Sequence, residues 1–162
     1  MLEDGALPQD IDAALEGYGF PMGLYAVNDM AGLEISWARR KRNAATRDPS
    51  ERYVAIADRL CEAGRFGRKT GKGYYTYENG EKAVDPDVTA LIEAASRDAG
   101  IERRSFSSSE IVERVMAGIV AEGRKILAEG IALRGSDIDL VLINGYGYPA
   151  WRGGPMFQAG VK

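Results

Sequence analysis

The chain has 162 residues, a formal net charge of −3, no histidine and one cysteine. The absence of histidine removes the Ser-His-Asp and Cys-His catalytic arrangements and most zinc sites, and a single cysteine rules out an internal disulfide. The acidic balance argues against non-specific nucleic-acid binding, and no apolar run approaches the length of a membrane span.

The first third of the chain predicts short helices separated by glycine turns. A helix is expected over 8–15, because proline is favoured in a first turn and aspartates complement a helix N-terminus. The glycine-rich segment 17–21 ends it. Helical spacing over 22–45 indicates one or two helices with a break at Gly32, and residues 52–63 repeat the pattern.

The middle of the chain predicts a loop, a small hairpin and a helix. Four glycines in residues 64–73 exclude a regular helix there. Tyrosines and threonine over 74–77 have strand composition, and Asn79-Gly80 is a turn signal, so a hairpin is expected near 73–80. A helix should cover 86–99.

The last third predicts one long helix and two short ones. Ser107 followed by Glu110 fits a capping box, and apolar residues at helical spacing continue to Leu127. A shorter helix is expected over 137–143, and another near Pro155. The fold class predicted is therefore all-α with at most one small β-hairpin.

Two parts of the chain repeat each other in the same order. Segments 2–6, 10–12 and 17–21 recur as 127–131, 137–139 and 145–149. The offset drifts by only a few residues, so a duplicated helical unit is indicated. We expect a first repeat over 1–100 that lacks its first helix, and a second over 107–162 that is truncated at its end.

Four stretches of the sequence carry a resemblance to a known family. They are Gly19-Phe20-Pro21-Met22-Gly23, Ala31-Gly32-Leu33-Glu34-Ile35, residues 65–77 and residues 144–156. With them the chain resembles the C-terminal region of the L-3-hydroxyacyl-CoA dehydrogenase part of multifunctional fatty-acid β-oxidation enzymes. In the first repeat, Leu24 stands where the family usually has proline and Glu34 replaces the usual aspartate.

The resemblance implies two truncated copies of the dehydrogenase's C-terminal helical unit, the second standing in for a partner subunit. It also implies NAD as cofactor of the complete enzyme, with an acyl-CoA substrate and an adjoining dinucleotide-binding domain. No glycine-rich strand-turn-helix motif and no catalytic histidine occurs here. We therefore expect no catalytic, cofactor-binding or metal-binding residue in this chain, and no dehydrogenase activity from it alone.

Two groups of residues are candidate sites. The resemblance suggests that Phe20, Pro21, Met22 and Gly23 line the acyl channel, since Met and Phe suit acyl chains of different length. The alternative is a helix-capping turn buried against the long helix, and both can hold.

The loop 64–73 supplies the second group, in which Arg65, Phe66, Lys69 and Lys72 are candidates for contacts with CoA phosphates or a dinucleotide domain. A turn whose glycines pack against a neighbouring helix is the alternative. The spacing differs from that of a phosphate-binding P-loop. The basic run 39–42 is interpreted as a solvated helix face.

The function predicted is the substrate-side and dimerisation-like region of an NAD-dependent L-3-hydroxyacyl-CoA dehydrogenase. Alternatives are a stand-alone helical module that completes a separately encoded dinucleotide-binding domain, or a non-catalytic acyl-CoA binder. A homo-oligomer, possibly a homodimer, is expected, with no nucleic-acid or membrane partner. The expected location is the cytoplasm or an organelle matrix.

Overall fold

The computed structural model describes residues 1–50 and 52–162. These residues are mostly helical, with one two-stranded antiparallel sheet, so the all-α prediction with a small hairpin is confirmed. In the same residues no helix is both long and apolar enough to cross a membrane. These residues also contain no cluster of three or more His, Cys, Asp or Glu side chains that could hold a metal ion.

The chain divides into two compact units that are interleaved in sequence. Unit 1 comprises residues 1–12 and 24–106, and unit 2 comprises residues 13–23 and 107–162. Helix α1 (Pro8–Tyr18) contributes its first part to unit 1 and its last part to unit 2. The division into repeats over 1–100 and 107–162 stays a prediction. The predicted boundary near residue 107 is also the boundary between the two compact units, but residues 13–23 belong to unit 2.

Unit 1 holds most of the short elements. After α1 it contains α2 (Leu24–Ala31), α3 (Leu33–Arg42), η1 (Ala44–Thr46), α4 (Ile56–Glu62), η2 (Arg68–Thr70), β1 (Tyr75–Glu78), β2 (Glu81–Val84) and α5 (Pro86–Asp98). The break expected at Gly32 is present between α2 and α3. Helices α4 and α5 supply several of the unit's buried side chains. The core is formed by fully or nearly fully buried side chains: Ile11, Leu33, Ile56, Leu60, Cys61, Tyr75, Val88 and Ile92.

Helix α4 is shorter than predicted. The spacing indicated a helix over 52–63, whereas α4 begins at Ile56. Tyr53 explains the late start, because its hydroxyl donates to Asp58 and its ring lies under the guanidinium of Arg47. These contacts hold residue 53 outside the helix.

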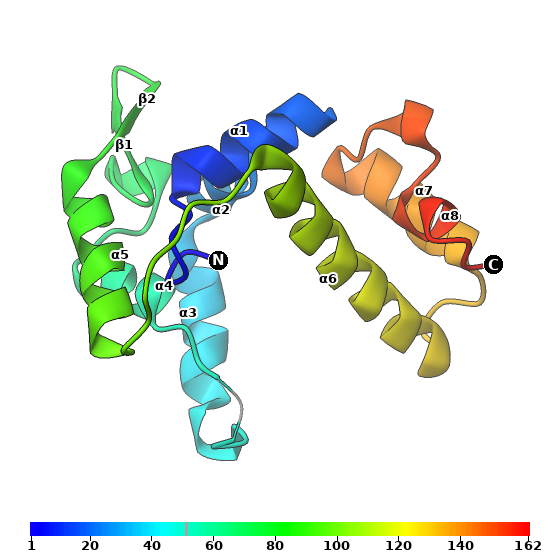
Figure 1. The fold of residues 1–162 in the computed structure, drawn as a ribbon, viewed down its shortest axis with the longest axis horizontal. Helices are drawn as coiled ribbons and strands as arrows, with labels where there is room; N and C mark the ends of the chain where they lie inside the picture. Colours follow the sequence, from blue (N-terminus) through cyan, green and yellow to red (C-terminus); the bar gives the residue numbers. More distant parts are fainter. Residues whose placement is uncertain (51) are drawn as a thin grey trace. The chain divides into compact units, whose positions relative to one another are not determined.

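Asn79-Gly80 forms the turn of the hairpin, as predicted, and the second strand extends to Val84, beyond the expected range 73–80. Both residues have positive φ (51° and 86°), as a two-residue hairpin turn requires. Strand β1 pairs with β2 in antiparallel register, with Tyr75 opposite Val84. The hairpin leads directly into α5 (Figure 1). Asp85 caps that helix by accepting the Asp87 N–H at 2.9 Å.

Unit 2 combines the end of α1 and the turn after it with the last third of the chain. Its further elements are α6 (Ser108–Ala128), α7 (Gly135–Tyr146), η3 (Ala150–Arg152) and α8 (Pro155–Gln158). Ser107 accepts the Glu110 N–H at 3.2 Å, so the cap predicted for the long helix is present. Helices α7 and α8 lie side by side and both contact α6 (Figure 1).

The sequence repeat has a structural counterpart in two buried carboxylates. Asp12 accepts the N–H groups of Tyr25 (2.8 Å) and Ala26 (3.0 Å) in α2. Asp139 accepts those of Met156 (2.8 Å) and Phe157 (2.9 Å) in α8. Each aspartate thus satisfies two free donors at the start of the next helix, and that explains its recurrence in both copies.

Candidate functional site

The turn proposed for the acyl channel packs into an aromatic cluster in unit 2. The ring centroids of Phe20 and Tyr148 are 5.5 Å apart, edge to face, and Tyr18 lies 6.1 Å from Phe20. The hydroxyls of the two tyrosines are 3.0 Å apart, and each lies within hydrogen-bond distance of Gln158 Oε1. Burial, with the hydrogen bond to Tyr18, raises the pKa of Tyr148.

The two copies of the glycine-aromatic-proline turn contact each other reciprocally. A Cβ atom on Gly19 would lie 3.1 Å from Pro149, and one on Gly147 would lie 2.9 Å from Pro21. The glycine of each copy therefore lies against the proline of the other copy. This is the pattern of a two-fold symmetric interface, here formed within one chain.

The four channel candidates thus have packing contacts of their own. Phe20 lies against the tyrosines, Pro21 lies over Gly147, and the N–H of the buried Gly23 donates to Glu16 Oε1 at 3.1 Å. Met22 is half-buried. The contacts named here are to the second copy of the turn and to α1, and Gly19 and Pro21 are exposed. The channel role of Phe20, Pro21, Met22 and Gly23 and the alternative of a turn buried against the long helix both stay predictions.

A hollow of about 520 Å³ lies close to this turn in unit 2. Arg152 borders it, with its guanidinium carbon 3.7 Å from the Tyr18 ring centroid and its Nε donating to the Tyr18 carbonyl at 3.0 Å. The hollow is lined by Ala13, Ala14, Gly17, Tyr18, Ser108, Ser109, Val112, Glu113 and Arg152. It offers apolar and polar side chains together.

In the second candidate region, the glycine loop of unit 1 wraps around a buried aspartate. Asp29 is 1% exposed and accepts the N–H groups of Tyr74 (2.8 Å) and Tyr75 (3.0 Å) and the hydroxyl of Tyr77 (3.1 Å). Burial raises the pKa of Asp29, although these hydrogen bonds oppose the shift.

Close approach to Asp29 explains two of the loop's glycines. A Cβ atom at Gly67 would collide with the Asp29 backbone, and one at Gly73 would collide with its carboxylate. The glycines therefore serve helix packing, as one of the two sequence interpretations held. Asp29 itself was missed, although a lone acidic residue among the apolar positions of a short helix is a signal for a buried cap.

The four basic and aromatic loop candidates are not equally free to contact a ligand. Arg65 is 7% exposed, with Nε donating to the Gly73 carbonyl at 2.8 Å and Nη2 to Asp85 at 2.6 Å. Phe66 lies 6.1 Å from the Trp37 ring.

The two lysines of this group lie on the surface. Lys69 is exposed and forms an ion pair with Glu34, and Lys72 is exposed. A contact of this group with CoA or a dinucleotide domain stays a prediction.

Comparison with known proteins shows what the chain is similar to. The model for the 3-hydroxyacyl-CoA dehydrogenase C-terminal domain matches residues 1–77. The region of dehydrogenase likeness extends beyond them: a solved structure of the dehydrogenase part of multifunctional enzyme 1 from C. elegans covers 90% of the chain. That match has a TM-score of 0.70 at 29% identity and spans 32% of the solved chain.

Curated relatives match almost the whole chain. The peroxisomal bifunctional enzyme of Danio rerio is 42% identical over 98% of it, and that of Homo sapiens is 39% identical over the same share. The glyoxysomal multifunctional protein MFP-a of Cucumis sativus is 31% identical. The chain spans about a quarter of the length of these relatives, 24% of the first two and 23% of the third. The predicted relationship to dehydrogenases of multifunctional β-oxidation enzymes is confirmed.

Proposed function

We propose that these residues form the substrate-side and pseudo-dimer region of an NAD-dependent L-3-hydroxyacyl-CoA dehydrogenase of fatty-acid β-oxidation. The observation that carries the proposal is the match to the C. elegans dehydrogenase part over 90% of the chain. The reciprocal contact of the duplicated turns supports it, because such a contact is what a fused copy of a two-fold dimer would retain.

The residues present do not fit NAD. In the described residues, the two strands form an antiparallel hairpin, with no parallel strand-helix-strand unit to receive a dinucleotide. In the glycine-rich loop 64–73, Gly67 and Gly73 pack against Asp29. We therefore assign no step of hydride or proton transfer to this chain, and place its contribution in shaping the acyl-CoA side of the site.

A chimera tests the proposed role. The matching segment of the Danio rerio enzyme is replaced by these 162 residues, and NAD-dependent oxidation of a 3-hydroxyacyl-CoA is followed by absorbance of NADH. We expect the chimera to retain activity, because the two segments are 42% identical over nearly the whole chain. A folded but inactive chimera would refute the proposal.

The isolated chain supplies the companion measurement. We expect no NADH formation from it with 3-hydroxybutyryl-CoA, because it contains no histidine and no dinucleotide fold in its described residues. Turnover by the isolated chain would contradict the assignment of the redox chemistry to other residues. Activity that appears only on mixing with a separate dinucleotide-binding protein would favour the stand-alone module.

Self-association is a further part of the proposal. Large apolar side chains are exposed around α7 in unit 2, including Ile131 (72%), Leu133 (89%) and Tyr146 (71%). They border a hollow of about 560 Å³. Contiguous exposed apolar surface favours association, and sedimentation of a clean monomer at micromolar concentration would count against it. Relatives are named peroxisomal or glyoxysomal, while the location of this chain stays a prediction.

A further inference from the structure

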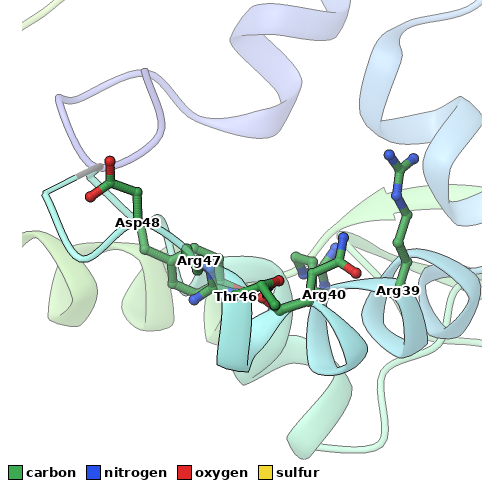
Figure 2. Close-up of a pocket in the computed structure, with 7 residues that line it drawn as sticks. Arg39, Arg40, Thr46, Arg47 and Asp48 are labelled. Atoms are coloured by element: carbon green, nitrogen blue, oxygen red, sulfur yellow. Dashed lines mark hydrogen bonds between the residues drawn. The ribbon is translucent and has the colours of Figure 1, made fainter.

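A basic hollow of about 500 Å³ lies in unit 1 where α3 ends. Its labelled side chains follow the end of that helix and the turn after it, with Arg39 and Asp48 at the two ends of the row (Figure 2). The hollow is lined by Arg39, Arg40, Asn43, Thr46, Arg47, Asp48 and Tyr53. Among the described residues, the lining therefore holds three arginines and one aspartate.

This region is strongly basic in an acidic chain. The chain carries a net charge of −3, yet residues 39–47 contain five cationic side chains and no carboxylate. The negative end of a helix dipole stabilises cations, and this accounts for the run 39–42 in the last turn of α3. It does not account for Arg47, which lies after η1 and outside the helix.

Two of the arginines are held in place by neighbours. Arg40 Nε donates to Asp58 Oδ1 at 2.6 Å, and the Tyr53 hydroxyl donates to the other oxygen of the same carboxylate. The guanidinium carbon of Arg47 lies 3.4 Å from the centroid of the Tyr53 ring. The interpretation of 39–42 as a solvated face therefore fails for Arg40, which is partly buried and paired.

Donors remain unused after these contacts. Arg40 Nη2 is buried and, within the described part of the chain, has no hydrogen-bond partner. Buried donors without an acceptor are rare in native structures and call for an explanation. Arg39 is exposed, and no ion pair to it is found in residues 1–50 and 52–162. Arg39 at this hollow thus offers N–H groups that no ion pair in the described residues occupies.

We propose that this hollow binds the phosphate group of a small phosphorylated ligand. The planar guanidinium fork matches phosphate oxygens in pairs, and two or three such groups around one hollow are suited to a dianion. Asn43 adds an uncharged amide beside them. The phosphate can be inorganic or belong to a nucleotide-type ligand, and the proposal does not depend on the dehydrogenase role.

The test is a titration of the 162-residue chain by calorimetry at low salt. The probes are sodium pyrophosphate, adenosine 3′,5′-bisphosphate and, as the phosphate-free control, adenosine. We expect saturable binding of both phosphorylated probes, which weakens as sodium chloride is raised because salt screens exposed charges. Adenosine should not bind.

Variants localise the binding. Arg39→Gln and Arg47→Gln should each weaken binding about tenfold, the loss expected for a charge-assisted hydrogen bond. Arg42→Gln is the matched control, because it removes the same charge from the same helix end without lining the hollow. It should leave the affinity within about twofold. Arg39 is exposed, so its substitution tests the site even if Arg47→Gln disturbs the fold.

The outcomes separate clearly. Tighter binding of the bisphosphate than of pyrophosphate supports the proposal with a nucleotide-type ligand, and equal binding supports it with simple phosphate. Absence of saturable binding overturns it. An equal loss of affinity in Arg42→Gln and Arg39→Gln also overturns the proposal, since the attraction would then be unspecific. Binding of adenosine as tight as that of its bisphosphate overturns it as well.

Discussion

Replacement of Asp139 by alanine removes the carboxylate that holds the start of α8 in unit 2. Asp139 is 5% exposed and accepts two N–H groups, from Met156 at 2.8 Å and Phe157 at 2.9 Å. A hydrogen bond to a charged acceptor contributes about 1.5 kcal/mol or more. Loss of both should lower the free energy of unfolding by about 3 kcal/mol, a large part of the roughly 5–15 kcal/mol typical of a domain.

Urea unfolding followed by circular dichroism measures this loss, and hydrogen exchange locates it in residues 135–158. Asp137→Ala is the matched control. Asp137 forms an ion pair with the exposed Arg134 and accepts the N–H of that residue at 3.1 Å. The control should cost about 1 kcal/mol or less. Equal losses in the two variants would refute the assignment of the larger role to the buried carboxylate.

Two further substitutions test other parts of the fold. Gly147→Ala should lower the free energy of unfolding by about 2 kcal/mol, because φ at this residue is 70° and the new Cβ would lie 2.9 Å from Pro21. The control is Gly145→Ala, whose Cβ would enter open space. It should be neutral in the same urea assay. Burial alone would raise the pKa of Asp85, but the hydrogen bonds from Arg65 and from the Asp87 N–H, together with the charges of Arg65 and Lys72, outweigh burial and lower it. The pair therefore stabilises the fold above the ordinary pKa of 3.8, and this is lost as the pH falls. Asp85→Asn should cost about 3 kcal/mol at pH 7, and this difference from the parent protein should shrink as the pH falls below 3.8. A difference that does not change with pH would contradict the pairing.

The duplicated pattern of the sequence predicted much of the architecture. The recurrence of Asp12 as Asp139, and of the glycine-aromatic-proline turn, indicated equivalent copies, and both recurrences have structural counterparts. Periodicity also located the helices, because one apolar face of each is buried. The start of α4 was missed, since side-chain contacts of Tyr53 override local helical preference.

The partners of charged side chains could not be predicted from the sequence. Arg65 and Lys69 share one basic loop, yet the structure buries the first against Asp85 and leaves the second on the surface beside Glu34. The basic hollow was likewise invisible, because Arg47 joins it through a ring contact with Tyr53 that no spacing rule encodes. Such pairings depend on tertiary proximity, which helix and strand periodicity does not specify.

The discontinuous make-up of unit 2 has a consequence for dissection of the protein. Residues 107–162 lack the strip 13–23 that supplies Tyr18, Phe20 and Pro21 to their aromatic cluster. A fragment that starts at residue 107 should therefore remain poorly ordered by itself. A synthetic peptide covering residues 8–23, added in trans, should restore its tyrosine ring contacts and could serve as the small half of a split reporter.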